Sequence, residues 1–363
     1  MRDSREARPA TLLIALISSL AVLLAACAPG AAPSPTAAPP KPTEAAQPAA
    51  QPAAQPAASP AGAATPAVAP AAAPAASPPA TAGAAPSMLK MAFVPSSDSA
   101  KVLASGKPIG DMLSQEIGMP VEVSVPTSYA AVVEAMGANQ VDVAWLAPFS
   151  YVVAHQKFGA DVILSSVRQG SKTYRSQIIT PADSPIKEVK DIKGKRFAFV
   201  DSASASGYLY PSALLKENGV DPKKDLGETV IAGGHDKVVI AVYNNQVDAG
   251  ATFGNSSESG PPTEARTLVV STLPDVMEKT RVLAQTEPIP NDTVSVRRGL
   301  SPDLVTRIRA GLLKIAQTDA GKQQLNSLYR IDGLSEASDK DYDGLRRVAQ
   351  SVGFDFEEQL KPK

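Results

Sequence analysis

Cysteine is almost absent from this chain: Cys27 is the only one among 363 residues, so no internal disulfide bond can form. Histidine is nearly as scarce, with His155 and His235 alone. No cluster of histidines and carboxylates has metal-ligand spacing, so we expect neither a metal nor a cofactor. Charge of one sign is also lacking, because 35 basic residues balance 36 acidic ones. Without a basic tract, nucleic-acid binding is not expected.

The first 26 residues have the pattern of a secretory signal. Arg2, Arg5 and Arg8 precede an apolar run from Thr11 to Ala26, which is shorter than the ~20 residues that a spanning helix needs. The run leads into Leu-Ala-Ala-Cys27, which resembles a bacterial lipobox, where the cysteine becomes the lipidated first residue. The resemblance implies that Cys27 anchors an extracytoplasmic protein to a membrane by lipid, which leaves no thiol for catalysis. An ordinary secretory signal with an incidental cysteine is the alternative.

Residues 27–87 follow as a segment of low complexity. From Ala28 to Ser87 the chain is almost entirely Ala, Pro, Gln, Ser, Thr and Gly, with charge only at Lys41 and Glu44. Such a composition cannot bury a hydrophobic core, and its prolines favour extended backbone. We therefore expect a disordered tether between the anchor and a folded body.

The folded body is expected over residues 88–363, where strand-like apolar runs alternate with helical patterns. Strands are predicted over 89–94, 121–125, 141–145, 162–167, 195–200, 226–231 and 247–252, and helices over 106–117, 128–136, 149–158, 186–192, 207–217, 235–243 and 302–317. This alternation favours α/β layering with a largely parallel sheet. The length allows two lobes. We assign residues 88–178 and 285–363 to the first lobe and residues 179–284 to the second.

One stretch of the sequence is repeated at a distance. Residues 129–142 align without a gap with residues 235–248, and both copies end in Asn-Gln-Val-Asp. Each copy predicts a helix, an Asn-Gln turn and a strand, which favours two similar lobes. Tyr129 and His235 begin the two helices. If both helices point into one cleft between the lobes, a tyrosine and a histidine face the same ligand.

The stretch from Phe197 to Tyr208 indicates an anion site. A short apolar strand runs into a loop with Ser202, Ser204 and Ser206, and a helix is predicted from residue 207. The free N–H groups of a first helical turn and the positive end of its dipole attract an anion, and serine hydroxyls add neutral donors. Capping of the helix by the same serines is the alternative.

Taken together, the motifs are similar to those of the substrate-binding proteins of phosphate, phosphite and phosphonate ABC transporters. They are Ser128-Tyr-Ala130, Val141-Asp-Val-Ala-Trp-Leu-Ala-Pro148 with Tyr151, Asp201-Ser-Ala-Ser-Ala-Ser-Gly207 and Gly233-Gly-His-Asp236. The resemblance covers nearly all of residues 88–350. It implies an α/β, two-lobed type II periplasmic binding protein fold, with a ligand cleft between the lobes.

The resemblance also implies which residues bind the ligand. By position in the family's motifs these are Tyr129, Tyr174, Ser204, Ala205, Ser206, Gly207 and His235. The family loop usually has threonine where this chain has Ala205, which removes a hydroxyl donor worth about 0.5–1.5 kcal/mol. For the substituent on phosphorus, Asn255, Glu258 and Asp292 are candidates, and its identity stays open.

Several of these residues also have structural explanations. In the structural alternative for Tyr129, the side chain packs with its hydroxyl at the protein surface. In the structural alternative for Tyr174, the residue is part of a crossover strand. Trp145 ends a buried strand and is expected in the core or the cleft wall. His155 is expected to face solvent. Asp142 and Asp248 are expected to cap or close turns near their strands.

The function expected from the sequence is that of an extracytoplasmic solute-binding lipoprotein. It captures a phosphonate-, phosphite- or phosphate-like oxyanion, acts as a monomer and delivers the ligand to an ABC permease, without enzymatic activity. A lipoprotein that senses the ligand and signals to a membrane partner is one alternative. A serine hydrolase is another, but the Gly-x-Ser-x-Gly elbow is missing, because the loop reads Ala203-Ser-Ala-Ser-Gly207.

Overall fold

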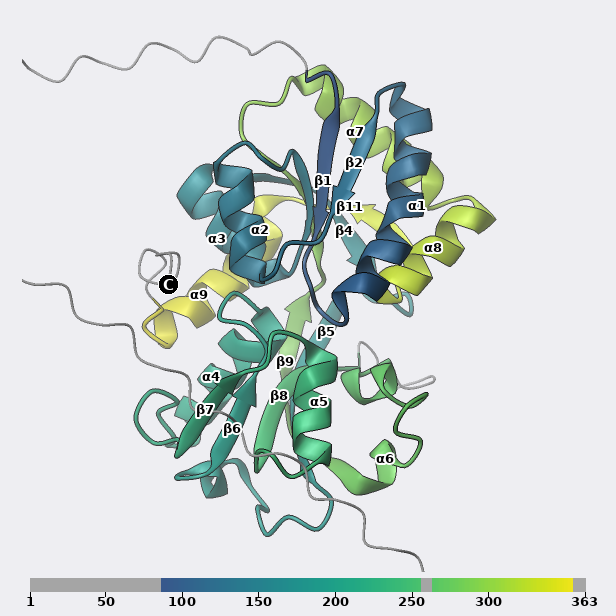
Figure 1. Ribbon diagram of the computed structural model, residues 1–363. Helices are drawn as coiled ribbons and strands as arrows, with labels where there is room; N and C mark the ends of the chain where they lie inside the picture. The colour runs from purple at the N-terminus through teal and green to yellow at the C-terminus, as the bar shows by residue number, and fades with distance from the viewer. Residues whose placement is uncertain (1–85, 256–262, 355–363) are drawn as a thin grey trace, which may run out of the picture. The chain divides into compact units, whose positions relative to one another are not determined.

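The computed structural model describes residues 86–255 and 263–354 (Figure 1). The predicted signal peptide, the Cys27 anchor and nearly all of the tether lie outside these residues. So do the candidate Glu258 and residues 355–363. Within the described part, two α/β lobes are built on two separate sheets.

The first lobe is built on a mixed six-stranded sheet in the order β11-β4-β10-β3-β1-β2. Its strands are β1 (Leu89–Phe93), β2 (Val121–Ser124), β3 (Val143–Leu146), β4 (Asp161–Val167), β10 (Thr293–Val296) and β11 (Gly333–Glu336). β2, β1 and β3 are parallel, and β10 is inserted antiparallel between β3 and β4. The late strands of the chain thus complete a sheet that the early ones begin.

Both faces of this sheet are covered by helices (Figure 1). Side chains alternate along β1, so that Met91 and Phe93 enter one core and Ala92 and Val94 the other. The first core is closed by α1 (Ser99–Ile117), α7 (Pro302–Ile315) and α8 (Asp319–Tyr329), and the second by α2 (Tyr129–Gly137) and α3 (Pro148–Phe158). The helix predicted over residues 302–317 is α7, whose residues Leu304, Ile308, Leu312 and Ile315 are buried in the first core.

The second lobe has a five-stranded sheet in the order β7-β6-β8-β5-β9. Its strands are β5 (Thr173–Pro181), β6 (Arg196–Phe199), β7 (Glu228–Ile231), β8 (Ala249–Gly254) and β9 (Thr280–Pro290). The sheet packs with α4 (Tyr210–Glu217), α5 (His235–Tyr243) and α6 (Val276–Lys279), and α9 (Asp343–Ser351) contacts both α3 and α4. The segment predicted as a helix over 186–192 is only a 3₁₀ turn, Val189–Ile192.

The internal repeat is a real structural equivalence. α2 and α5 each have nine residues, and Asn139 and Asn245 after them share a left-handed backbone, with φ of 58° and 56°. The Asp142 carboxylate accepts the N–H of Lys90 at the start of β1, and the Asp248 carboxylate accepts the N–H of Arg196 at the start of β6. The two aspartates therefore have the same role in both lobes, which is to bond the start of the neighbouring strand and not to close a local turn as predicted.

The strand neighbours follow the same plan in both sheets. β1 lies between β2 and β3 as β6 lies between β7 and β8, and one antiparallel strand follows on the far side of β3 and of β8. The prediction of a largely parallel sheet needs this correction: there are two mixed sheets. Four antiparallel strands were not predicted: β5, β9, β10 and β11.

The chain crosses between the lobes twice, over residues 168–172 and 291–292. The boundaries expected at 178/179 and 284/285 fall inside β5 and β9, whose whole lengths belong to the second sheet. Asn291 joins the two crossovers, because its side-chain amide donates to the carbonyls of Ser166 (3.0 Å) and Ser171 (2.9 Å) and its oxygen accepts from Arg168 (3.3 Å).

Within residues 86–255 and 263–354, no helix has both the length and the apolar character needed to span a membrane. The same residues contain no group of three or more His, Cys, Asp or Glu side chains that could hold a metal ion.

Replacing Asn291 with alanine should destabilise the protein by about 2–4 kcal/mol, because two buried carbonyls lose their donors at once. Denaturant unfolding of the Asn291→Ala variant measures this. Asn218→Ala is the matched control, since the exposed Asn218 amide bonds only a carbonyl of its own helix, and we expect a change below about 0.5 kcal/mol. Equal effects in the two variants would contradict a joining role for Asn291.

Candidate functional site

A cavity of about 560 Å³ lies between the two lobes, and the crossovers contribute to its wall. It opens at the carboxyl ends of the parallel strands: Val94 follows β1, Ala147 follows β3, and Phe253 and Gly254 end β8. Ligands of α/β sheets bind at this edge, because the chain leaves each strand there and turns into a helix.

In the described part of the chain, five helical segments begin at this cavity. The cavity wall includes the N-cap residues Asp98 of α1, Ala147 of α3 and Ser204 of the turn before α4, and the first residues Tyr129 of α2 and His235 of α5. Each helix start presents backbone N–H groups and the positive end of a dipole. Together they create a positive potential that does not depend on lysine or arginine.

The serine loop runs into a wide helical turn. Residues Ala205–Leu209 form a π turn, and α4 follows from Tyr210. Pro211 has no N–H to donate to the Gly207 carbonyl, four residues earlier, and that carbonyl accepts the Val200 N–H instead (3.0 Å). The proline therefore favours the wide turn. A widened helical turn of this kind is common at functional sites.

Hydroxyl groups of this turn face the cavity. Ser204 and Ser206 line it, and each is 1% exposed. The Ser204 oxygen accepts the Gly207 N–H (3.0 Å), so capping and ligand contact are compatible: the oxygen caps the turn and its O–H stays available as a donor. The Ser206 hydroxyl lies beside the phenol of Tyr174, another predicted residue of the wall.

Ala205 and Gly207 do not line the cavity. The Ala205 side chain is fully buried in the hydrophobic core, so this position can offer a ligand only its backbone. The Gly207 N–H already donates to Ser204. Glycine is needed there for packing, because a Cβ at residue 207 would lie 2.4 Å from the Cβ of Val200. The structure thus corrects the expectation for Gly207: its amide holds the turn together.

The starts of α2 and α5 are each capped by the opposite lobe. The Tyr129 N–H donates to the carboxylate of Asp201 in the second lobe (3.2 Å), and the His235 N–H donates to the Ser96 carbonyl in the first (2.9 Å). These reciprocal contacts join equivalent helices across the cleft. Both form only while the lobes are close together.

Both predicted tyrosines are protonated donors. Burial raises the pKa of Tyr129 well above its usual value, and the negative charge of Asp201 raises it further. Burial also raises the pKa of the Tyr174 phenol. The alternative for Tyr129, a hydroxyl at the protein surface, is wrong, because the side chain is 1% exposed and lines the cavity. Tyr174 lies in β5, just after the first crossover, and it also lines the cavity.

His235 is held as a neutral donor in one tautomer. Its Nδ1 accepts the Phe253 N–H (3.3 Å), which requires this nitrogen to be unprotonated, and it lies 2.8 Å from the Thr252 hydroxyl. The proton must therefore reside on Nε2. Burial lowers the pKa of His235 to about 3. His235 lines the cavity, so the Nε2–H group is the one that a ligand can use.

The three residues proposed to contact the substituent on phosphorus differ in where the structure places them. Asp292 lines the cavity, but its carboxylate is paired with the Arg168 guanidinium at 2.5 Å. Asn255 is not part of the cavity wall, and its side-chain oxygen accepts the Thr263 N–H instead (2.8 Å). Glu258 lies outside the described residues. A free carboxylate for an ammonium group is therefore not found at Asp292.

Sequence reasoning missed several residues of the wall. Ser96 and Ser97 follow β1 as the serine loop follows β6, so the repeated pattern of strand, hydroxyl-rich loop and helix was a usable signal. Tyr329 donates to the Val94 carbonyl (2.6 Å). Tyr329 and Arg330 follow no motif, and only the packing of the end of α8 brings them to the cavity.

Two further expectations are tested by the packing. Trp145 is a core residue: it is fully buried and stacks on Phe93 with ring centroids 5.0 Å apart. The expectation that His155 faces solvent holds only in part, because both ring nitrogens also have protein partners. Its side chain is 32% exposed, its Nδ1 lies 2.8 Å from the Ala160 carbonyl, and its Nε2 lies 3.7 Å from the Asp339 carboxylate. Asp339 comes from a distant part of the chain, which the local sequence around His155 does not reveal.

The fold and this interlobe cavity define a type II periplasmic binding protein. Solved structures with the same fold include a binding protein of an ABC phosphonate transporter from Pseudomonas aeruginosa (TM-score 0.66, 23% identity, 73% of this chain and 86% of that one). Another is PhnD1 from Prochlorococcus marinus in complex with methylphosphonate (TM-score 0.63, 18% identity, 74% of this chain and 99% of that one).

Sequence comparison identifies the family. Residues 91–342 match the family described as "ABC transporter, phosphonate, periplasmic substrate-binding protein". The chain is 30% identical over 295 residues to the phosphate-import protein PhnD of Mycolicibacterium smegmatis, covering 75% of this chain and 88% of that protein. It is 27% identical over 221 residues to the phosphonates-binding periplasmic protein of Escherichia coli, covering 60% and 62%. The chain therefore belongs to the periplasmic substrate-binding proteins of phosphonate ABC transporters, as the motifs predicted.

His235 should make folding stability fall in acid. Its pKa drops from a usual value of about 6.5 to about 3 on folding. Below pH 6.5, His235 is therefore protonated in the unfolded chain but stays neutral in the native state. The free energy of unfolding should then decrease by up to about 1.4 kcal/mol per pH unit between roughly pH 6 and pH 4. Denaturant unfolding of wild type and of His235→Gln across this pH range measures the contribution of His235, because glutamine does not titrate.

NMR of the imidazole nitrogens gives an independent check of the same prediction. The His235 resonances should show the Nε2–H tautomer and should not titrate between pH 8 and pH 5. A midpoint near pH 6.5 would exclude the buried neutral state.

Proposed function

We propose that this protein captures a phosphate-like oxyanion in the interlobe cavity and delivers it to an ABC permease. The observation that carries the proposal is the convergence of five helix starts on one cavity between the lobes. The same cavity is lined by the neutral donors Ser204, Ser206, Tyr129, Tyr174 and the Nε2–H of His235. Relatives named for phosphate import and for phosphonate binding support this ligand class.

Neutral donors suit a ligand that must be released again. A phosphorus oxyanion offers several oxygens in a tetrahedral arrangement, and hydroxyl, phenol, imidazole and amide N–H groups can surround them. Hydrogen bonds to a charged acceptor are worth about 1.5–3 kcal/mol each. A few of them therefore give strong binding without a permanent ion pair.

Binding should favour the closed lobes. The serine loop and His235 belong to the second lobe, whereas Tyr129 belongs to the first, so a ligand completes its contacts only when the two approach. A ligand shifts a conformational equilibrium by its differential affinity for the two states. The contacts of Tyr129 with Asp201 and of His235 with Ser96 form in the same closed arrangement.

The chemistry of the site argues for binding without turnover. A serine hydrolase needs a histidine that accepts the serine proton. The Nδ1 of His235 is occupied by Phe253 and Thr252, and burial lowers the pKa of His235 to about 3. Such an imidazole is a hydrogen-bond donor and a very weak base. We therefore infer that this chain has no hydrolase activity.

Calorimetry with methylphosphonate and with inorganic phosphate tests the proposed site. Ser206→Ala and His235→Gln should each weaken binding by about 1–3 kcal/mol, because each removes or displaces a buried donor to an anion. Ser202→Ala is the matched control: Ser202 belongs to the same loop but not to the cavity wall, so its affinity should stay within about twofold of wild type. The proposal fails if wild type binds no phosphorus oxyanion, or if all three variants behave alike.

We further propose that Cys27 carries a lipid anchor and that the segment after it is a tether. The lipobox-like residues Leu24 to Cys27 support this. In a bacterial host, metabolic labelling with a fatty acid should mark the wild-type protein, and Cys27→Ser should abolish the label and release the protein from the membrane fraction. Purified protein that begins at residue 86 should keep its affinity for methylphosphonate. Labelling that persists in Cys27→Ser would refute the anchor.

A further inference from the structure

Arg330 occupies an unusual backbone position. It caps the end of α8 in the left-handed region, with φ of 55°, where glycine or asparagine is normally found. Four non-glycine residues in the described ranges have positive φ: two are Asn139 and Asn245, and the other two, Gln169 and Arg330, both line the cavity. Non-glycine residues in this region concentrate at functional sites.

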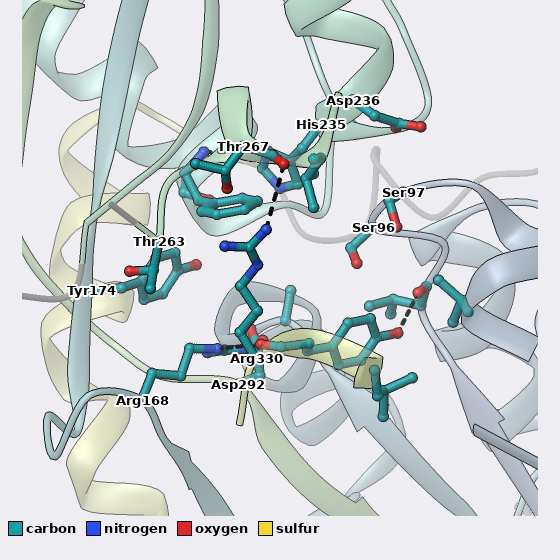
Figure 2. A pocket seen from close by; sticks show the side chains of 18 of the residues that line it. Ser96, Ser97, Arg168, Tyr174, His235, Asp236, Thr263, Thr267, Asp292 and Arg330 are labelled. Atoms are coloured by element: carbon teal, nitrogen blue, oxygen red, sulfur yellow. Dashed lines mark hydrogen bonds and ion pairs between the residues drawn. The ribbon is translucent and has the colours of Figure 1, made fainter. Parts of the chain in front are cut away.

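The Arg330 side chain has no carboxylate partner among the described residues. Its recorded hydrogen bond is a long one, 3.5 Å from a guanidinium nitrogen to the Thr267 carbonyl of the second lobe. Figure 2 shows the side chain extending across the cavity toward Thr267 and His235. Burial lowers the pKa of Arg330, although the group stays charged at any physiological pH. Most of its five N–H donors are therefore open to a ligand.

The other cavity arginine is differently placed. Arg168 donates to the Asp292 carboxylate, the Tyr329 carbonyl and the Asn291 side chain, so its charge and its donors are satisfied by protein. The contrast is visible in Figure 2, where Arg168 ends at Asp292 while Arg330 continues into the cavity. Arg168 is thus part of the crossover network, and Arg330 is the guanidinium that remains for a ligand.

No carboxylate of the cavity wall forms an ion pair with Arg330. Asp292 is paired with Arg168. Asp332 accepts the Gln169 N–H, and Asp98 accepts the Lys101 N–H at the start of α1. Asp236 lies at the start of α5, and one of its carboxylate oxygens is buried with no hydrogen-bond partner among the described residues. In Figure 2 this side chain lies beyond His235, away from Arg330. Arg330 is therefore an unpaired positive charge in the part of the cavity that it enters.

We propose that Arg330 recognises a second anionic group on the ligand, so that the preferred substrates are phosphonates or phosphates with an anionic substituent. This rests on the proposed function, with the phosphorus oxyanion at the serine loop. The cavity of about 560 Å³ has room for both groups, since a tetrahedral oxyanion displaces only about two or three water molecules at ~30 Å³ each. The second group is a carboxylate or another phosphoryl group, because a guanidinium binds both by paired hydrogen bonds.

Calorimetry with four compounds tests this: methylphosphonate, phosphonoacetate, methylenediphosphonate and 2-aminoethylphosphonate. Wild type should bind phosphonoacetate or methylenediphosphonate at least about tenfold more tightly than 2-aminoethylphosphonate, and the better of the two identifies the second group. In Arg330→Asn, affinity for that compound should fall about 10–100-fold, as for loss of charge-assisted hydrogen bonds. Methylphosphonate affinity should stay within about threefold.

Two controls separate charge from folding. Asparagine tolerates the left-handed backbone, as Asn139 and Asn245 do here, so Arg330→Asn should unfold at the wild-type temperature or above. Lys322→Gln removes one positive charge from the exposed side of α8, outside the cavity wall, and should leave all four affinities unchanged.

The outcomes distinguish this inference from the proposed function. If wild type binds none of the four compounds, both fail. If methylphosphonate binds and depends on Ser206, but Arg330→Asn leaves the ranking of the compounds unchanged, only the role of Arg330 is overturned. An equal loss for methylphosphonate and phosphonoacetate in Arg330→Asn would overturn it as well, because Arg330 would then hold the phosphoryl group itself.

Discussion

The convergence of helix N-termini on one cavity is the constraint on which the rest of this site depends. Helices that follow parallel strands all begin at one edge of a sheet, and here two such edges face each other. Their dipoles place positive potential in the space between the two edges, and contacts with the opposite lobe cap the first N–H groups of α2 and α5. This explains why the wall near the serine loop consists of hydroxyls, phenols and a neutral imidazole. Charged side chains of the wall lie at the starts of α1 and α5, at the crossovers and at the end of α8.

Because the two lobes repeat the same architecture, the helix starts also favour closure of the lobes. Equivalent helices, α2 and α5, begin on opposite sides of the cavity, and each start is capped by an atom of the other lobe. An isolated lobe would leave those N–H groups to water. Closure therefore satisfies backbone donors and surrounds the ligand at once, while Asn291 keeps the two crossovers together as the lobes meet.

The two histidines show how tertiary context decides chemical role. His235 follows two glycines at a helix start, and its partners Thr252 and Phe253 come from the adjacent strand β8. Those contacts fix its tautomer, and burial keeps it neutral. His155 lies near the end of α3, and the distant Asp339 approaches it only because the last part of the chain packs there. Neither set of partners can be found from the residues next to the histidine.

The sequence by itself determined the α/β class, the duplicated helix–turn–strand unit and the serine-rich loop before α4, because these depend on residues within a few positions of one another. It also located Tyr129, Ser204, Ser206 and His235, since each stands at a recognisable helix start.

Only the tertiary structure decided what depends on pairs distant in the chain. Asp292 was a candidate to bind an ammonium group, but it pairs with Arg168 and belongs to the crossover network. The end of α8 brings Tyr329 and Arg330 into the cavity wall. The insertion of β10 between β3 and β4, and the full extent of β5 and β9, also follow from strand pairing across the chain. Local propensity carries no information about such contacts, because their energy comes from burial and from partners more than a hundred residues away.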